Sequence, residues 1–354
     1  MERLVITGIG PLTPIGTGKE QFWDALKNGY TGIKRITRFS SNIEYYGGEI
    51  SNLDFDEYFP HGKFRRAAEI SKYTIVAIKL AIDDANACTS DRKKTGIIVG
   101  LTHGALNYTQ SYHKLLITEG VASASPILFS DSLLNAPAGN ASISFGVNGP
   151  VHTLIGGKTT AAKSIILASQ IIASGTIDKA IVVSADELNE LLCLTYLRLG
   201  LDTLSEGAGA LVLEKENTMI GSPYCYLTGI SSHINPSNPQ TALYETMKKS
   251  LKMADIGIED IDLVVMDSPL PEIQELRLTG IPVVCITPFT GNAFALSSLW
   301  NIIVSALIIR HGMIPPSIIH NKNTEIPYDK VNNIMLCIIE KEGSAASMIL
   351  SKYS

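Results

Sequence analysis

A lysine and two threonines follow a glycine pair in the segment LIGGKTTAAKS at residues 154–164. A phosphate-binding P-loop needs a glycine, four further residues and then Gly-Lys-Ser/Thr, so that the backbone can turn around the phosphate. His152 stands where that first glycine should be, so the pattern fails for ATP or GTP. The same order of strand, turn and helix can also hold a nucleophile at a helix N-terminus, where the macrodipole stabilises a thiolate. Lys158 occupies that place as a cation, which the dipole disfavours.

The residues leave two interpretations of Lys158 open. In the first, its ammonium group fills the site and pairs with a nearby carboxylate. In the second, a lysine with a lowered pKa attacks a carbonyl substrate and forms a Schiff base, which requires desolvation or a neighbouring cation. We expect the first of the two.

Histidine and cysteine residues do not fall into ligand patterns. The seven histidines and five cysteines are scattered singly, without the paired spacings of zinc sites or the density of a disulfide scaffold. We therefore expect no metal and no cofactor. Single cysteines also favour a reducing compartment, and the N-terminal stretch lacks the pattern of a signal peptide, so we expect a cytoplasmic protein.

The composition excludes several classes of partner. Of the 354 residues, 45% are hydrophobic and 18% are charged, which suits a large dry core. The formal charge of −5 provides no basic surface for nucleic acid. Apolar stretches such as residues 297–312 are interrupted too early to span a membrane, so we expect buried helices and no membrane association.

The elements that would position these residues follow an alternating pattern. Short apolar, β-branched runs such as 96–100 and 209–214 predict strands, and segments with helical periodicity lie between them. Strands that are apolar throughout indicate sheets covered on both faces, and hence an α/β fold. The similar segments VITGIG (5–10) and YLTGIS (226–231) further predict two related halves, 1–220 and 221–354, that share a core.

Four motifs in order give the chain a resemblance to a known family. It resembles the β-ketoacyl synthases, condensing enzymes of the thiolase superfamily, over almost its whole length. The resemblance implies a thiolase-like fold with αβαβα layers. The motifs are VITGIGPLTPIGTGKEQFWDAL (5–26), SPILFSDSLLNAPAGNASISFGVNGP (125–150), SEGAGALVLE (205–214) and GMIPPSI (312–318).

Carried onto this sequence, every catalytic position of the family is replaced. The active-site cysteine falls on Lys158, the first histidine on Asp267, the second on Asn292 and the nearby lysine on Thr287. The family's glycine-rich loop near the C-terminus is reduced to IEKEGSAAS (339–347). Condensation needs a thiolate to carry the acyl chain and imidazoles to assist decarboxylation. A lysine would hold an acyl group as a stable amide, and Asp267 would repel an enolate. The resemblance also makes Asp267 the candidate partner of the Lys158 ammonium group.

One catalytically silent member of the family resembles this chain further. It is the chain length factor of type II polyketide synthases, which forms a heterodimer with an active β-ketoacyl synthase served by an acyl carrier protein. Residues 104–120 resemble its tunnel helix, and the resemblance places Leu106, Thr109 and His113 on the face that enters the partner's tunnel and controls chain length. The strand VHTLI (151–155) is expected to pair across the two-fold axis. Known chain length factors carry glutamine where this chain has Lys158.

Two other functions stay open at this point. The chain could be a diverged acyl-thioester transferase or decarboxylase that uses Lys158 or Asp267, or a homodimeric binding scaffold. The chain is also shorter than typical family members. The losses are expected near the mouth of the active site, at 193–202, 235–245 and 268–281.

Overall fold

The computed structural model describes residues 3–39, 43–51, 53–60, 62, 64–86, 93–201, 203–267, 280–320 and 331–353. Within these ranges the core is a mixed sheet in the order β12-β11-β13-β14-β10-β1-β9-β7-β5-β6. Strands of the first half are β1 (Leu4–Thr13), β5 (Thr95–Leu101), β6 (Val151–Ile155), β7 (Lys179–Asp186) and β9 (Gly207–Lys215). Strands of the second half are β10 (Cys225–Ile234), β11 (Leu263–Met266), β12 (Val283–Val284), β13 (Asn333–Ile339) and β14 (Ser344–Lys352).

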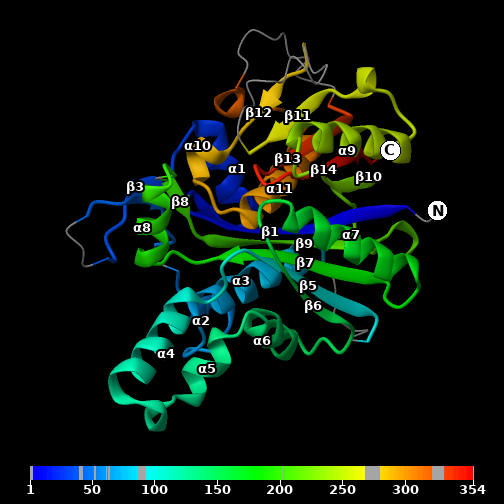
Figure 1. Cartoon of the computed structure of the whole chain (residues 1–354). Helices are drawn as coiled ribbons and strands as arrows, with labels where there is room; N and C mark the ends of the chain where they lie inside the picture. Colours follow the sequence, from blue (N-terminus) through cyan, green and yellow to red (C-terminus); the bar gives the residue numbers. More distant parts are fainter. Residues whose placement is uncertain are drawn as a thin grey trace.

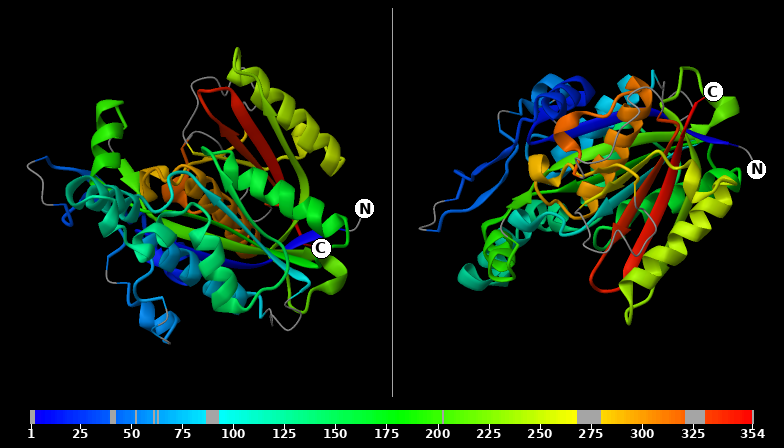
Figure 2. Two further views of the ribbon diagram at one scale, coloured as in Figure 1. Left: turned by 60° about the horizontal axis from the view of Figure 1, so that its bottom comes forward. Right: turned by 90° about the horizontal axis from the view of Figure 1, so that it is seen from above.

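The helices complete five alternating layers (Figures 1 and 2). Two outer helices, α3 (Glu69–Asp84) and α9 (Pro239–Ala254), cover β1, β9 and β7 on one side and β10, β14 and β13 on the other. Two central helices, α7 (Thr160–Ala173) and α11 (Ala295–His311), contact strands of both halves. The predicted αβαβα fold is therefore confirmed.

The central position of α11 follows from its sequence. Its residues from Ala295 to Ile309 are all buried, and a helix that is apolar all round must lie inside a protein. Trp300 is fully buried and its indole N–H donates to the carbonyl oxygen of Ala208 at 3.0 Å. Strands β7 and β9 are likewise buried along nearly their whole length, as their apolar sequences predict.

The two segments with the Thr-Gly-Ile motif meet at the centre of the sheet. β1 and β10 pair antiparallel, with Val5 opposite Tyr226. In each half the motif glycine lies against an outer helix, because a Cβ on Gly8 would overlap the backbone of α3 and one on Gly229 the backbone of α9. The shared motif thus has the same packing role on both sides. The division into halves near residue 220 stays a prediction with which this arrangement agrees.

The remaining elements surround one end of the sheet. A small sheet contains β3 (Ile33–Arg35), β4 (Tyr46–Gly48) and β8 (Thr203–Ser205). Figure 1 shows α4 and α5 projecting from the body of the molecule, and neither helix has a buried residue. The other elements are β2 (Gly16–Thr17), α1 (Gly18–Asn28), α2 (Phe55–Tyr58), α4 (Leu106–Glu119), α5 (Pro126–Ser132), α6 (Ala136–Phe145), α8 (Glu190–Arg198) and α10 (Thr287–Thr290).

Candidate functional site

Lys158 lies in the turn between β6 and α7, where the strand, the glycine pair and the helix place it at the start of α7. Its Nζ lies 3.8 Å from Oδ2 of Asp267, at the end of β11. The lysine side chain is 26% exposed and the aspartate side chain 7% exposed. The predicted ion pair is therefore confirmed, although it joins residues more than a hundred positions apart.

Asp267 is held by α11 as well as by Lys158. Ser298 donates to its Oδ2 at 3.3 Å, and the side-chain amide of Asn301 donates to its Oδ1. Burial raises the pKa of Asp267, while Lys158 and the two donors favour the charged carboxylate. The aspartate is thus a buried group that Lys158, Ser298 and Asn301 all contact.

A second carboxylate, from Glu340, occupies the start of α7. Its Oε1 accepts the backbone N–H of Thr159 at 2.7 Å, at the end of the helix where the dipole favours negative charge. The carboxylate fits there because residue 157 is glycine, since a Cβ on Gly157 would overlap it. Thr159 also shares a hydrogen bond with Ser344 at 2.9 Å. The site is therefore filled by groups of the chain itself, and a bound phosphate would be repelled.

Sequence reasoning did not single out Glu340. The signal was present in the segment 339–347, where charged residues replace a glycine-rich loop. Its meaning depends on a contact between residues 159 and 340, which local patterns do not encode.

Thr287 and Asn292 differ in their relation to this site. Thr287 donates its hydroxyl to the backbone carbonyl of Asp267 at 2.6 Å, so it belongs to the cluster. Asn292 instead bonds through its backbone to Thr203 and Ser205, both at 2.9 Å, and its Oδ1 accepts the N–H of Phe294. Among the residues that the structure describes, no hydrogen bond or ion pair joins Asn292 to Lys158 or Asp267.

The cysteines do not supply a replacement nucleophile in the described part of the chain. Cys193, Cys225, Cys285 and Cys337 are all buried and free. Burial raises the pKa of each thiol, and that of Cys193 to about 12. A thiol with a raised pKa forms little of the reactive thiolate at neutral pH. Cys285 also donates to the carbonyl oxygen of Asp267 at 3.2 Å.

The three residues expected at the tunnel share one groove. Leu106, Thr109 and His113 all lie on α4 and line a groove of about 650 Å³ between this helix and α8, where Leu191 and Leu192 face them. Their common position agrees with the helical spacing i, i+3 and i+7. Control of chain length by these residues stays a prediction.

Glu187 fixes the start of α4. Its carboxylate accepts the N–H of Asn107 at 2.8 Å and the N–H of Ile70 at 3.2 Å, and so joins α4 to α3. Burial raises the pKa of Glu187 from 4.5 to about 7. The position of the groove therefore depends on a carboxyl group that titrates near neutral pH.

His103 lies at the inner end of the groove and was not expected there. Its ring nitrogens contact Asp186 at 3.3 Å and the hydroxyl of Tyr196 at 3.1 Å. The ring of Phe294 packs edge-on against His103, and Phe294 adopts a φ of 51°, which non-glycine residues rarely do. These aromatic groups form a wall held in a strained backbone conformation, a contact between distant segments that sequence spacing does not reveal.

The chain is similar in sequence to known proteins. The family model for the N-terminal domain of β-ketoacyl synthases matches residues 1–201, which is more than half of the chain. The chain therefore belongs to the β-ketoacyl synthase family. A 3-oxoacyl-(acyl-carrier-protein) synthase 2 from Rhizobium meliloti (strain 1021) is 26% identical, covering 100% of both chains. The enzyme of the same name from Staphylococcus aureus (strain COL) is 26% identical, covering 90% of this chain and 88% of its own.

Solved structures share the fold at lower identity. The ishigamide ketosynthase/chain length factor superposes with a TM-score of 0.90 and 20% identity, covering 100% of both chains. A structure described as AntDE:AntF, a type II PKS acyl-carrier protein in complex with its ketosynthase bound to the hexaketide, gives a TM-score of 0.82 and 18% identity, with 99% and 100% coverage. At these identities the likeness concerns the fold.

The chain is shorter than its relative from Rhizobium meliloti. Their alignment extends over 422 residues although this chain has 354, so the relative carries segments that this chain lacks. Of the segments where losses were expected, 193–202 lies largely in α8 and 235–245 runs into α9. Residues 268–279 of the third lie outside the described ranges. No helix among the described residues combines the length and apolar character needed to cross a bilayer.

Proposed function

We propose that this chain is a catalytically inactive subunit of the chain-length-factor kind, which forms a heterodimer with an active β-ketoacyl synthase in type II polyketide biosynthesis. The observation that carries the proposal is the ion pair of Lys158 and Asp267 at the position of the family's nucleophile. An ammonium group held by a carboxylate has no lone pair for attack on a thioester. Once acylated, it would form an amide, which does not release the chain to a second nucleophile.

The surroundings of the pair oppose the other steps of condensation. Decarboxylation of a malonyl unit produces an enolate, which needs hydrogen-bond donors or cations at the developing oxygen charge. Here the carboxylates of Asp267 and Glu340 already hold Lys158 and the N–H of Thr159. A second negative charge at this place would be repelled by both.

An exposed apolar surface is available for a protein partner to bind. Strand β6 is the last strand of the sheet, and its Val151 and Ile155 are 36% and 47% exposed. Such an edge exposes unpaired backbone groups and readily accepts a strand from another chain. The surface continues over α6, which contacts β6, and over α5, which contacts α6. Ile143 of α6 and Ile127 and Phe129 of α5 are exposed on it. We place the two-fold axis of the heterodimer at β6.

The groove at α4 gives the subunit its role in the complex. Leu106, Thr109 and His113 are proposed to close the partner's tunnel and so set the length of the acyl chain. Enlarging Leu106 to phenylalanine should shorten the products of the reconstituted complex, and Thr109→Ala should lengthen them. Ser111→Ala is the matched control, because Ser111 lies on the same helix outside the groove and donates to its own backbone. Identical products from L106F, T109A and S111A, with assembly intact, would defeat this role.

The proposal also names a carrier protein as the source of acyl groups and the cytoplasm as the location of the complex. An acyl carrier protein would deliver acyl groups to the complex through the active partner. The buried, free cysteines fit the reducing cytoplasm, where we place the complex. The chain's two halves, with a boundary near residue 220, would act as one unit in it.

A direct experiment separates this proposal from the enzyme and scaffold alternatives. The purified chain is incubated with malonyl- and acyl-carrier protein and followed by mass spectrometry for an adduct or for lost CO₂. The proposal predicts neither, and co-expression with an active ketosynthase should give a one-to-one complex. An adduct on Lys158 or decarboxylation would establish the acyl-thioester transferase or decarboxylase. A stable homodimer that ignores the ketosynthase would favour the scaffold.

A further inference from the structure

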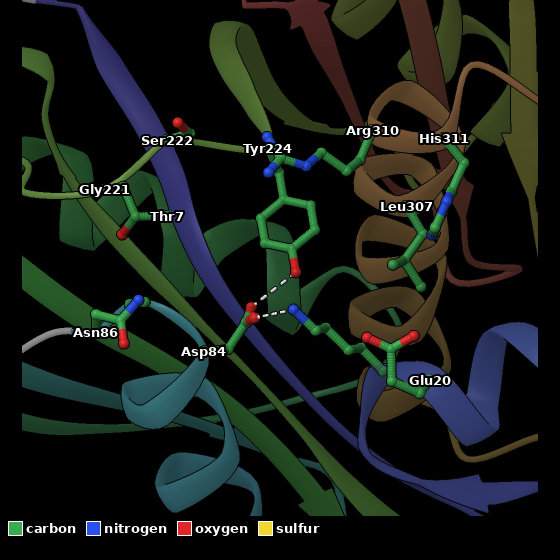
Figure 3. A pocket seen from close by; sticks show the side chains of 12 residues that line it. Thr7, Glu20, Asp84, Asn86, Gly221, Ser222, Tyr224, Leu307, Arg310 and His311 are labelled. Carbon is green, nitrogen blue, oxygen red and sulfur yellow. Dashed lines mark hydrogen bonds and ion pairs between the residues drawn. The ribbon is translucent and has the colours of Figure 1, made fainter.

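A separate cavity of about 440 Å³, here called the polar cavity, lies where the two halves of the chain meet. It is bordered by the start of α1, the end of α3, the linker before β10 and the end of α11. Its volume lies in the range of small-molecule sites, roughly 300–1,000 Å³. Its polar lining, shown in Figure 3, consists of Thr7, Lys19, Glu20, Asp84, Asn86, Ser222, Tyr224, Arg310 and His311.

The floor of the polar cavity is rigid and close to neutral. The carboxylate of Asp84 accepts the N–H of Ile9 and the hydroxyl of Tyr224, both at 2.9 Å, and pairs with Nζ of Lys19 at 2.5 Å. Burial and the nearby Asp84 raise the pKa of Tyr224, so its phenol stays protonated. The charges of Lys19 and Asp84 thus offset each other, and neither needs a ligand.

Arg310 is different, because it lies at the exposed end of α11 and is not held by a carboxylate in the described part of the chain. Its guanidinium lies over the ring of Tyr224, 5.9 Å from the centroid. Within the described residues no carboxylate pairs with it, and Glu20 across the cavity also has no hydrogen-bond or ion-pair partner there. A guanidinium offers five N–H donors in a planar fork that matches a carboxylate or phosphate group.

His311 also lines the polar cavity. Its ring stacks on Trp23 at a centroid distance of 4.5 Å and an interplanar angle of 10°. Burial lowers the pKa of His311; Glu20 opposes this effect, and the cations Lys27, Arg310 and Lys19 add to it. The imidazole is therefore neutral at pH 7 and free to share a hydrogen bond with a ligand.

We propose that the polar cavity binds a small organic anion, whose carboxylate or phosphate group is held by Arg310, while His311 lines the same cavity. The hydroxyl of Ser222 and the amide of Asn86, which have no side-chain hydrogen bond among the described residues, face the cavity from the opposite side (Figure 3). They provide donors and acceptors for the remaining polar groups of the ligand. This site is independent of the proposed function, since none of its residues belongs to the cluster around Lys158.

Calorimetric titration with inorganic phosphate and with citrate, at an ionic strength held constant with chloride, tests the site. We expect saturable binding of at least one of these anions to the full chain or its complex. Arg310→Gln should weaken binding roughly tenfold through the loss of a charge-assisted bidentate contact. Glu20→Gln should strengthen it, because a competing carboxylate is removed. Lys248→Gln is the matched control, since Lys248 also lies over a tyrosine ring, that of Tyr244 at 5.4 Å, but on α9.

A second measurement keeps the test decisive if R310Q folds poorly. NMR titration of His311 should show its pKa rising when phosphate or citrate is added, because the bound anion stabilises the imidazolium. The proposal is overturned by the absence of saturable binding for both anions. It is equally overturned if E20Q and the wild type bind alike and the pKa of His311 does not move.

Discussion

Replacing Lys158 by methionine tests its ion pair with Asp267 at the start of α7. Nζ of Lys158 lies 3.8 Å from Oδ2 of Asp267. At that separation the Coulomb attraction is about 4 kcal/mol for an effective dielectric constant of ~20 and about 1 kcal/mol in bulk water. Solvent partly screens the lysine, and Asp267 keeps its bonds to Ser298 and Asn301. We therefore expect a net coupling energy of about 1–2 kcal/mol between the two side chains.

A double-mutant cycle of K158M, D267N and the double variant measures this coupling by urea unfolding at pH 7. K163M is the control, because Lys163 lies on α7, just after Lys158, and donates to Ser344 at 3.1 Å, with no carboxylate partner among the described residues. Burial raises the pKa of Asp267, so acidification toward pH 4 protonates this carboxyl group and the coupling should shrink. Additive effects within about 0.3–0.5 kcal/mol, or a coupling that does not depend on pH, would refute the reasoning.

Three further predictions concern the surroundings of the two sites. The pKa of Glu187 rises from 4.5 in the unfolded chain to about 7 in the folded one. Its contribution to the free energy of unfolding is therefore fully present below pH 4.5 and is lost as pH rises to 7. The loss amounts to up to roughly 3 kcal/mol. Urea midpoints should show this loss in the wild type relative to E187Q, and parallel pH profiles would contradict it. Gly157→Ala should destabilise the chain by about 1–3 kcal/mol, because its Cβ displaces the carboxylate of Glu340 from the N–H of Thr159. The same substitution should cost little in an E340A background. Thermal unfolding that shows equal losses in both backgrounds would count against the contact of Glu340 with Gly157. Ile155→Lys on β6 should prevent co-purification with an active ketosynthase. Ile220→Lys should not, because Ile220 is 79% exposed and lies outside the strands and helices. A complex retained with I155K would exclude β6 from the interface.

The layered fold could be predicted because its signals are local. The apolar runs at β7 and β9 and the largely apolar helix α11 favour burial on every side, which an enclosed α/β arrangement provides. The resemblance to chain length factors singled out Leu106, Thr109 and His113, and their helical spacing predicted that they share one face of α4. The pairing of Lys158 with Asp267 could be predicted because the family resemblance assigned both residues to one active site.

Contacts between distant segments could not be predicted in the same way. Glu340 reaches the N–H of Thr159 only because the loop before β14 passes the start of α7. The wall of His103, Tyr196 and Phe294 combines three segments, and the φ of 51° at Phe294 has no sequence signal because most residues with such a backbone are glycines. The polar cavity arises for the same reason, since its lining comes from both halves of the chain.

The most direct test of an inactive, length-setting subunit is a condensation assay with three samples: this chain alone, an active ketosynthase alone, and the two co-purified together. Each receives malonyl-carrier protein and an acyl primer, and products are separated by mass and length. The account predicts no C–C bond formation by the chain alone and products of defined length from the complex. Condensation or thioester turnover by the isolated chain would contradict it.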